Sequence, residues 1–398
     1  MWRRYGATPL HLFLKATPCF HFDITTLTAQ ISIILIFVVA TLYAVVGVAA
    51  MFIARRTRAL PPSDDETDLP TVSVLVAARN EERHLPDCLR ALREQDYPAE
   101  RIEFLIADDH STDRTPSVIR EAAREDERFR WVAVPDAPDG LPRGKPNALH
   151  AAYGRASGEV LLVTDADCAP PPGWARHMAA QFRDERLGVA CGVTWVKAGG
   201  SALGRIQTLD WLLLLTVASA AASVGLPITA MGNNMAFRRE AYDAVGGYPA
   251  LPFSVTEDFA LFQAVHRAGW NVRLVLAETL RNATRPLRSL RAVVRQRRRW
   301  ARGGLAAPWW VYGLYALVFG THGLLVAGLV AAPLAALGGL AAKCGVDALL
   351  LGIGGARLGK RPPLRLLPAF EAYLFGYVLL MPAALAVFPR IRWKGRRF

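Results

Sequence analysis

Two aspartates one residue apart follow an apolar run in the middle of the chain. Asp165 and Asp167 end the stretch 159–167, whose apolar residues predict a buried β-strand. Mg²⁺ and Mn²⁺ prefer oxygen ligands, and they often share a few protein carboxylates with the phosphates of a substrate. Such a cation would neutralise a diphosphate and stabilise it as it leaves. Pairs of aspartates are also common in turns, so the plainer interpretation of this motif alone is a turn without a ligand.

A second acidic pair, Glu257 and Asp258, lies in the stretch 256–269. Thr256 is a suitable N-cap, which places both acids in the first turn of a predicted helix. Acids there are favoured by the helix dipole, and this structural role is the simpler interpretation of the pair alone. The functional interpretation is a carboxylate that takes the proton from an attacking hydroxyl.

Basic residues at two further places suit a phosphate. Lys145 stands at the start of a predicted helix, where a lysine can contact a phosphate or another acidic group. Downstream, five arginines and Trp300 occupy the eight residues 295–302, and a long apolar tract follows almost at once. One interpretation of this run is a signal for membrane topology and nothing more. The other places part of it at a site where it offsets the charge of a departing diphosphate.

The elements that would position these residues alternate between strand and helix over residues 70–280. Such alternation indicates a mainly parallel, doubly wound α/β sheet. A further strand and a short helix are expected within 231–248, with Gly246 and Gly247 ending that helix. The other predicted strands are 71–78, 102–109, 130–134 and 159–167, and the predicted helices between them are 84–95, 117–126 and 146–157.

Three of the predicted strands end in polar clusters. Open α/β sheets bind ligands in the crevice beyond the carboxyl ends of their strands, and we therefore expect the three clusters to share one cleft. One polar strand end means little, whereas three at the same edge suggest a site. The clusters are Arg79, Asn80 and Glu81 after the first strand, Asp108 and Asp109 after the second, and Asp165 and Asp167 after the strand that ends at residue 167.

The N-terminal part contains a segment that is long enough to cross a membrane. Residues 31–53 are 23 consecutive uncharged residues, which at 1.5 Å per residue span a hydrocarbon core of about 30 Å. A signal peptide is the rival interpretation, but its apolar region would be shorter and nearer the N-terminus. Three arginines follow within residues 55–58, so the positive-inside rule places residue 54 onward in the cytoplasm.

Apolar segments also follow the arginine-rich run. Residues 309–355 are long enough for two spans with a turn near Pro333, although two charged residues weaken the second span. Residues 366–388 form a third segment, which Glu371 and two prolines interrupt. The basic tail 390–398 is expected to be cytoplasmic, so one of the three segments is not expected to be a full crossing.

The apolar stretch 205–227 is expected to form a buried or interfacial helix. A crossing there would place the two acidic pairs on opposite sides of the membrane. The expected organisation is an N-terminal segment 1–30, a transmembrane helix 31–53, a linker 54–69, a cytoplasmic catalytic domain 70–304, a membrane region 305–389 of two or three helical segments, and a basic cytoplasmic tail 390–398.

The basic excess of the chain is confined to the flanks of its apolar segments. The net charge is +13, while residues 281–302 hold nine arginines without an acid and residues 355–398 hold nine lysines and arginines with Glu371 as their only acid. This distribution favours membrane topology over nucleic-acid binding, and no RNA- or DNA-binding motif supports the latter. Five scattered cysteines without a CxxC pair predict neither a zinc site nor a disulfide framework.

Taken together and in order, the motifs resemble those of membrane-anchored family 2 glycosyltransferases. That group includes cellulose-, chitin- and hyaluronan-synthase-like enzymes and ceramide-glucosyltransferase-like enzymes. The resemblance covers about residues 70–305 and implies a GT-A fold, a nucleotide-sugar donor with UDP as the expected nucleotide, and an inverting single displacement assisted by Mg²⁺ or Mn²⁺. The motifs are VSVLVAARNE, ADDHSTDRT, RGKPNAL, TDAD, GNNMAFRR…GGY, TED and QRRRW.

On the donor side, the resemblance assigns contacts to the nucleotide. It implies that Asn80, Glu81 and Asp109 hold the nucleoside and that Lys145 touches the nucleotide. One position departs from the pattern, because many such motifs read Asp-Asp-Gly or Asp-Asp-Ser whereas this chain has His110. The departure puts the identity of the nucleotide base in question, and not the fold.

On the reaction side, the resemblance implies that Asp165 and Asp167 bind the metal and the diphosphate. Asp258 would be the catalytic base, with Glu257 beside it. In the family the Q(Q/R)xRW motif lies at the acceptor and diphosphate end of the cleft. Its matching residues here are Gln296, Arg299 and Trp300, with the guanidinium expected at the diphosphate and the indole against a sugar or lipid headgroup.

We therefore expect an integral membrane enzyme that transfers a sugar from a nucleotide-sugar donor to a lipid or glycan acceptor, with no nucleic-acid partner. The small number of spans favours a lipid or lipid-linked acceptor, since a processive polysaccharide synthase needs a channel of several helices. A transporter would need ionisable residues inside several helices, and only Lys343, Asp347 and Glu371 qualify. An inactive scaffold would not be expected to keep every acidic position. The abundance of arginine and alanine suggests a bacterial inner membrane.

Overall fold

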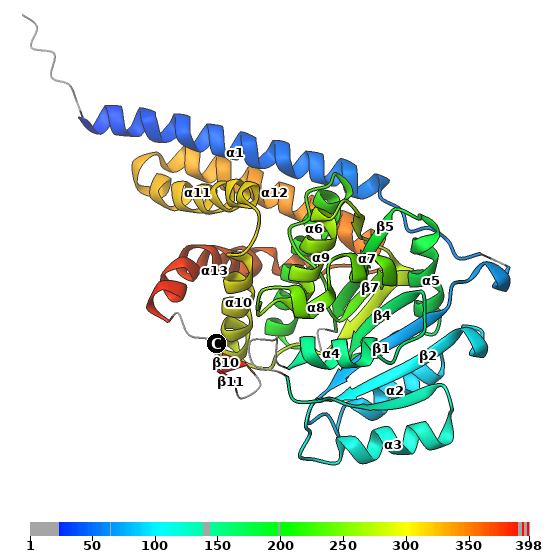
Figure 1. Ribbon diagram of the computed structural model, residues 1–398. Coiled ribbons are helices and arrows are strands. Elements are labelled where there is room, and N and C mark those ends of the chain that lie inside the picture. Colours follow the sequence, from blue (N-terminus) through cyan, green and yellow to red (C-terminus); the bar gives the residue numbers. More distant parts are fainter. Residues whose placement is uncertain are drawn as a thin grey trace, which may run out of the picture.

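An α/β domain is packed against a set of long helices that project from one side of it (Figure 1). Residues 1–23, which make up most of the expected N-terminal segment, lie outside the described part of the chain, as does most of the basic tail. The computed structural model describes residues 24–63, 65–137, 144–197, 200–388, 392–393 and 396–397.

The central sheet has seven strands in the order β3-β2-β1-β4-β7-β5-β8. Neighbouring strands are parallel except at β7, which is antiparallel to both β4 and β5. The mainly parallel, doubly wound sheet is therefore confirmed. The strands are β1 (Val72–Ala78), β2 (Ile102–Asp108), β3 (Phe129–Ala133), β4 (Val160–Asp165), β5 (Leu187–Cys191), β7 (Asn234–Arg238) and β8 (Asn271–Leu274), and a separate parallel pair is formed by β6 (Val193–Val196) and β9 (Arg281–Thr284).

Helices cover both faces of this sheet. Side chains of a strand point alternately to opposite faces, so Leu75 packs in one hydrophobic core and its neighbours Val74 and Val76 pack in the other. Burial on both faces explains why these strands are continuous apolar runs. One core lies under α2 (Leu85–Arg93), α3 (Thr115–Glu125) and α5 (Trp174–Ala180), and the other under α4 (Lys145–Tyr153), α6 (Ala202–Ser223), α7 (Arg239–Ala244), α8 (Gly247–Ala250) and α9 (Glu257–Arg267).

The register of the strands brings their polar ends to one edge. Ala78 at the end of β1 pairs with Asp108, and Ala77 pairs with Asp165 at the end of β4. Because β7 runs the other way, its first residue, Asn234, lies opposite Thr164 at the same edge. The loop before β7 therefore lies at the edge of the sheet where the sequence predicts the site.

Helix α6 joins the sheet to the long helices. The Ser219 hydroxyl donates to the Leu274 carbonyl of β8 (2.7 Å), and the Thr208 hydroxyl donates to the Val196 carbonyl of β6 (3.0 Å). On its other side, a Cβ placed on Gly354 would lie 2.1 Å from the Thr216 hydroxyl, so another long helix approaches closely there. More than half of the most apolar part of α6 is buried, in agreement with the buried helix that we expect from the sequence.

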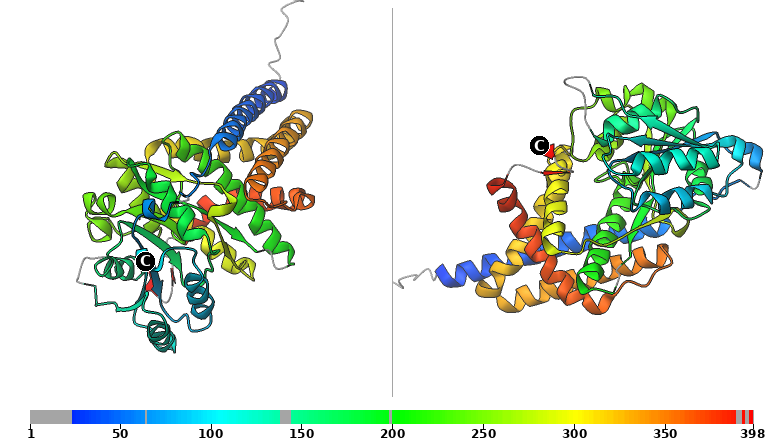
Figure 2. Two further views of the ribbon diagram at one scale, coloured as in Figure 1. Left: turned by 90° about the vertical axis from the view of Figure 1, so that its right-hand side faces the viewer. Right: turned by 90° about the horizontal axis from the view of Figure 1, so that it is seen from below.

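The chain has four more long helices, and three of them pack against α6. By length and composition, five helices of the described residues are long and apolar enough to cross a membrane. The predicted turn near Pro333 is confirmed, since Ala332 is the only residue between the helix that ends at Ala331 and the helix that begins at Pro333. Besides α6 they are α1 (Ile24–Arg56), α11 (Trp309–Ala331), α12 (Pro333–Arg357) and α13 (Leu367–Val387), with α1 lying along α11 and α12 (Figures 1 and 2).

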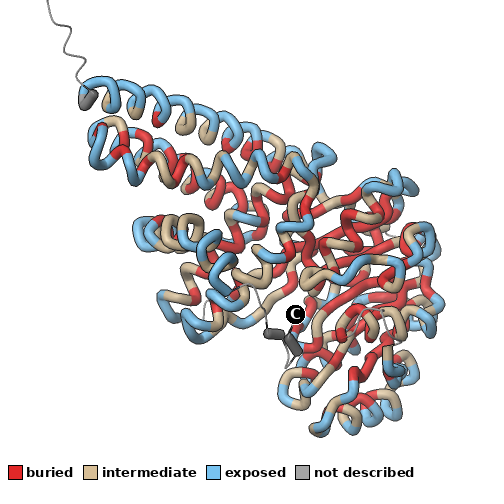
Figure 3. The backbone as a smooth tube through the Cα atoms, turned by 60° about the vertical axis from the view of Figure 1, so that its left-hand side comes forward, coloured by how far each residue is buried: buried red, intermediate tan, exposed pale blue. Residues whose placement is uncertain are grey.

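The charges that weaken the second C-terminal span neutralise one another. Lys343 Nζ lies 2.7 Å from Asp347 on the same helix and 2.5 Å from Glu371 on α13. Tyr43 of α1 donates a hydrogen bond of 2.7 Å to Asp347. The three charged residues are buried, and α12 consequently runs unbroken past both of its charges. Over the chain as a whole, buried positions gather in the α/β domain, and much of the surface of the projecting helices is exposed (Figure 3).

The C-terminal end of α13 returns to the α/β domain. The chain leaves that domain through α10 (Leu290–Gly304), the helix that contains the arginine-rich run. Arg298 of α10 donates a hydrogen bond to the carbonyl of Phe388, and its guanidinium lies 5.4 Å from the centre of that ring. The residue that follows α13 is thus held beside α10.

Candidate functional site

One cavity of about 1000 Å³ begins at the polar edge of the sheet. It gathers side chains from strand ends, from the start of two helices and from α10. Of the residues predicted for the site, all except Asn80 line this cavity. They are Glu81, Asp109, Lys145, Asp165, Asp167, Glu257, Asp258, Gln296, Arg299 and Trp300.

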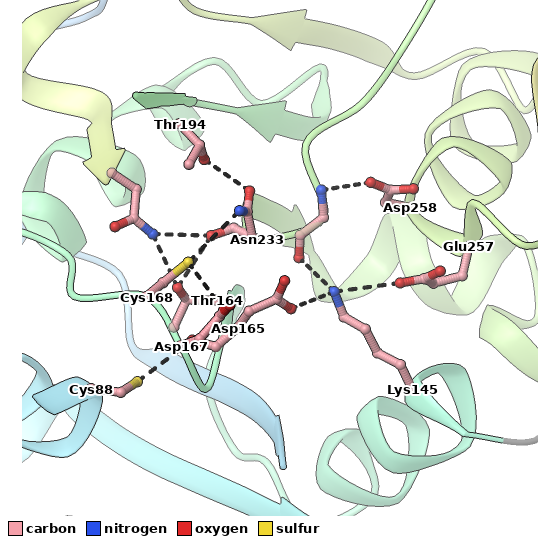
Figure 4. Close-up of polar contacts among 12 residues, drawn as sticks. Cys88, Lys145, Thr164, Asp165, Asp167, Cys168, Thr194, Asn233, Glu257 and Asp258 are labelled. Carbon is pink, nitrogen blue, oxygen red and sulfur yellow. Dashed lines mark hydrogen bonds and ion pairs between the residues drawn. The ribbon is translucent and has the colours of Figure 1, made fainter. Parts of the chain in front are cut away.

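Lys145 links three of the segments that meet there. It is the first residue of α4, and its ammonium lies 2.6 Å from Asp165 Oδ1 and 3.4 Å from Glu257 Oε1. It also donates to the carbonyl of Gly232 in the loop before β7 (3.2 Å). Figure 4 shows the ammonium between these three acceptors. The two acidic pairs, about ninety residues apart in the sequence, are therefore joined by one lysine.

The charges of this cluster depend on one another. Burial alone would lower the pKa of Lys145, but Asp165 and Glu257, with a smaller contribution from Asp258, outweigh it and raise that pKa above the usual range. Burial raises the pKa of Glu257, and Lys145 opposes that rise. The lysine therefore keeps a fixed positive charge at the strand edge, where a diphosphate would need it.

The structure gives the two acids of the second pair different surroundings. Glu257 is 7 % exposed and points toward Lys145, whereas Asp258 is less buried. Asp258 Oδ2 accepts a hydrogen bond from the backbone N–H of Gly232 (2.7 Å). A Cβ on Gly232 would lie only 2.7 Å from the Asp258 Cβ, so this close approach requires glycine. Asp258 is the better placed of the two to accept a proton in the cavity.

The cap expected for the helix of the acidic pair is only partly present. Thr256 occupies the N-cap position of α9, but its side chain makes no capping hydrogen bond. Its hydroxyl instead lies 3.2 Å from that of Ser254, and a Cβ on Gly303 of α10 would lie 2.2 Å from it. Helix α10 therefore packs closely against this residue.

Helix α10 is fixed to the start of α9 by a second contact. Arg299 Nη1 donates to the carbonyl of Val255, just before the acidic pair, at 2.9 Å. The positive charge of Arg299 also acts on Glu257. The arginine of the Q(Q/R)xRW motif therefore positions the acidic pair as well as contributing charge to the cavity.

A buried cluster behind Trp300 was not foreseen from the sequence. Arg297 is 2 % exposed and forms an ion pair with Asp210 of α6. Its guanidinium lies 4.2 Å from the centre of the Trp300 ring, and Trp211 meets the same ring edge-on at 5.1 Å. Tyr373 of α13 donates to Asp210 (2.9 Å). One signal could have identified Asp210, which is the only acid in the apolar stretch 205–227.

Asn80, which the resemblance places at the nucleoside, does not line the cavity in this structure. It is exposed and adopts a left-handed conformation (φ 55°), as does His110 (φ 56°). Its side-chain oxygen accepts from the Thr112 backbone N–H (2.8 Å), and its own N–H donates to the Ser111 hydroxyl (3.0 Å). This conformation turns the side chain to the 110–113 loop and away from the cavity. Asn80 therefore ties the loops after β1 and β2 together.

The acidic residues after β4 suit a shared divalent cation. In the described ranges no group of three or more His, Cys, Asp or Glu side chains could hold a metal ion. Asp165 and Asp167 thus offer two carboxylates, and Lys145 already contacts one of them. Mg²⁺ or Mn²⁺ commonly takes one or two protein carboxylates when phosphate oxygens and water complete the shell. The donor set fits such a cation only together with a phosphate-containing substrate.

The same cavity continues into the long helices. Beyond Trp300 its wall is built from α1, α6, α11, α12 and α13 and is mostly aliphatic. It therefore connects carboxylates at the sheet edge with the apolar interior of the helix bundle. Each of the five helices contributes lining residues, for example Val46, Leu214, Leu317, Leu350 and Leu385 in the same order.

Comparisons with known proteins agree with this geometry. The model of glycosyl transferase family 21 matches residues 33–398. A beta-monoglucosyldiacylglycerol synthase from Nostoc is 28 % identical over 59 % of this chain and 49 % of its own length. A poly-beta-1,6-N-acetyl-D-glucosamine synthase from Staphylococcus epidermidis is 25 % identical over 66 % of this chain and 62 % of its own length. The chain thus spans about half to three fifths of these relatives.

A solved structure shares the fold over most of the chain. It is a mannosyltransferase from Pyrobaculum calidifontis in complex with GDP-Man and Mn²⁺. The match covers 90 % of this chain and 99 % of the other, with a TM-score of 0.57 and 21 % identity. The similarity confirms the arrangement expected from the motifs, a GT-A sheet followed by apolar C-terminal helices.

Proposed function

Since the chain belongs to glycosyltransferase family 21, we propose that it transfers a sugar from a nucleotide-sugar donor to a lipid or lipid-linked acceptor at the cytoplasmic face of a membrane. The reaction is proposed to invert the anomeric carbon and to use Mg²⁺ or Mn²⁺. The cavity that joins the acidic edge of the sheet to the membrane helices carries this proposal.

The donor is proposed to lie across the ends of β1, β2 and β4. Asp109, buried next to Arg79, and Glu81 hold the nucleoside, with UDP as the expected nucleotide. Lys145 contacts the diphosphate and is already oriented by Asp165 and Glu257. Asp165 and Asp167 hold the divalent cation, which supplies charge neutralisation to the diphosphate as it leaves. The mannosyltransferase of the same fold was solved with a nucleotide sugar and Mn²⁺, which supports this assignment.

Asp258 is proposed as the catalytic base. Inverting transfer needs one carboxylate that accepts the proton of the acceptor hydroxyl as oxygen attacks the sugar. The backbone N–H of Gly232 fixes one carboxylate oxygen of Asp258. Glu257 contacts Lys145 and is proposed to position it. Arg299 holds the loop that carries both acids and adds positive charge on the diphosphate side.

The acceptor is proposed to be a lipid because of what lines the far part of the cavity. A hydrocarbon chain can lie against aliphatic side chains at no cost, whereas a hydrated glycan would lose hydrogen bonds to water there. The lipid hydroxyl would then stand at Trp300, between the apolar wall and Asp258. The Nostoc relative is named for a glycolipid, monoglucosyldiacylglycerol, which supports a lipid of this class.

The orientation in the membrane is proposed from charge and from the end of α13. Helix α1 ends in Arg55 and Arg56, and Arg58 follows, which favours a cytoplasmic α/β domain. The contact between Arg298 and Phe388 supports a basic tail on the same side as that domain. In this arrangement α13 does not make a full crossing.

A processive polysaccharide synthase is the second candidate, favoured by the Staphylococcus relative. Radiolabelled nucleotide sugars supplied to membranes that contain the protein separate the two. We expect the label to enter the organic phase on lipid extraction. Label in an ethanol-insoluble polymer that no lipid extraction removes would support the synthase and contradict the lipid acceptor.

A further inference from the structure

A groove on the helix bundle is separate from the cavity of the site. It has a volume of about 540 Å³ and lies where α1 and α12 both end. Arg55 and Arg357 form its charged end, and most of its remaining wall is aliphatic. Leu349 and Leu364 line it and are 58 % and 38 % exposed. The groove therefore has the two parts that a phospholipid has, one charged and one apolar.

The arginines at this groove are not neutralised by the protein. Over the described ranges no carboxylate lies within ion-pair distance of Arg55, Arg58 or Arg357. The Nε of Arg357 is buried and has no acceptor among those residues. Arg58 adds a like charge close to Arg357. Burying an N–H without an acceptor is costly, so an anion at this place would remove a penalty.

The two stretches of chain that form the groove contain no acid, and the nearby Glu278 is paired with Arg281. Residues 54–62 and 348–370 contain no aspartate or glutamate, whereas Lys360, Arg361 and Arg365 add further positive charge. The carbonyl ends of two helix dipoles lie here and favour cations, but each contributes only about half an elementary charge. The local excess of positive charge therefore calls for an outside anion.

We propose that this groove binds one anionic phospholipid of the cytoplasmic leaflet. Its phosphate lies between the guanidinium groups of Arg55 and Arg357, which can each donate two N–H groups to phosphate oxygens. One acyl chain lies along Leu349 and Gly352 of α12. Basic pockets between membrane helices are well suited to such headgroups, because anionic lipids concentrate near them.

The bound lipid would stabilise the joint between α12 and the α/β domain. Arg281 of β9 donates to the carbonyl of Leu358, directly after α12, at 2.6 Å. A Cβ on Gly359 would lie 2.2 Å from the carboxylate of Glu278, so the chain is packed tightly on the domain at this point. A ligand that binds the folded protein at this joint raises its resistance to unfolding.

The test uses purified full-length protein, with retained phospholipid measured by native mass spectrometry and stability by thermal unfolding. The wild type should retain one phosphatidylglycerol through mild delipidation, and added phosphatidylglycerol, unlike phosphatidylcholine, should raise its Tm. The double variant Arg55→Gln/Arg357→Gln should bind this lipid about 10- to 30-fold more weakly. Its control, Arg361→Gln/Arg365→Gln, changes the net charge equally outside the groove and should retain the lipid.

A second variant fills the groove without touching the arginines. A Cβ on Gly352 meets no atom within 4 Å, so Gly352→Leu should fold and exclude the lipid. Gly345→Leu is its control, because position 345 is equally open but does not line the groove. Equal retention in the groove variants and their controls would overturn the proposal. An equal rise in Tm with inorganic phosphate alone would reduce the groove to a simple anion site and overturn the lipid assignment.

Discussion

Arg297 of α10 and Asp210 of α6 form a buried ion pair directly behind the Trp300 ring. The pair connects the arginine-rich helix with the helix that joins the sheet to the membrane region. Tyr373 of α13 completes the cluster from a third helix. The run of arginines therefore contains one residue that faces the interior of the protein and is no part of a topology signal.

Removal of one partner of this pair should destabilise the protein. Arg297→Met leaves the Asp210 carboxylate buried without its cation, a change that costs about 3–5 kcal/mol. The double variant Arg297→Met/Asp210→Leu removes both charges and should recover most of that loss. Thermal unfolding in detergent measures both variants. A double variant no more stable than the single one would show that the unpaired charge of Asp210 is not the cause of the loss.

Arg299 should tolerate substitution less well than other arginines of the same helix. Arg299→Lys keeps the charge but lacks the planar group that reaches the Val255 carbonyl, so we expect it to stay in the membrane and lose most of its activity. Arg291→Lys and Arg302→Lys should change turnover little. Equal tolerance at all three positions would mean that the run serves topology alone.

Gly232 should be essential for the position of Asp258. Gly232→Ala puts a methyl group 2.7 Å from the Asp258 Cβ and pushes the carboxylate away. A displacement of about 1 Å at a reacting group can cost about 100-fold in rate, and we expect turnover to fall by that order with nucleotide affinity retained. Gly313→Ala meets no neighbouring atom and is the control. Full turnover in Gly232→Ala would separate Asp258 from the chemistry.

The metal can be tested without disturbing Lys145. Asp165 forms the ion pair with that lysine, so Asp165→Asn would also break this contact, and Asp167→Asn is the variant of choice. We expect Asp167→Asn to lower transfer about 100-fold or more, and EDTA to abolish it until Mg²⁺ or Mn²⁺ is added. Undiminished transfer in EDTA would remove the metal from the mechanism.

The orientation of the chain can be measured with introduced cysteines in a background that lacks Cys19 and Cys344 and keeps the three buried cysteines. A cysteine at Gly395 should resist an impermeant thiol reagent in intact cells, because the basic tail is expected in the cytoplasm. A cysteine at Val330, which is 90 % exposed at the end of α11, should react. Labelling at position 395 would show that α13 crosses the membrane.

Local patterns were enough to predict the edge of the sheet. Strands β1, β2 and β4 are apolar runs because both faces of the sheet are buried, and the polar residues that follow them meet as parallel strands require. The partner of a side chain far away in the sequence could not be read in this way. Arg297 and Asp210 are 87 residues apart, and nothing local shows that side chains of α6 and α10 meet.

Two further features depended on the folded chain. Asn80 matches a motif position, yet its left-handed backbone turns the side chain to Thr112, and a one-dimensional motif carries no dihedral angle. The apolar extension of the cavity needs five helices packed together, although each helix was individually visible as a hydrophobic segment. The sequence predicted these elements, but it did not predict how they pack against one another.

The most direct test of the account is the rate of sugar transfer to extracted lipid in Asp258→Asn. Asparagine keeps the size of the side chain but cannot accept the proton of the acceptor hydroxyl, and loss of a general base costs about 10²–10⁴-fold in rate. We predict a fall of that order, with nucleotide affinity unchanged and with Asp243→Asn, on α7 and outside the lining of the cavity, as an active control. Transfer at the wild-type rate, or loss of nucleotide binding in its place, would contradict the assignment of Asp258 as the base that activates a lipid acceptor.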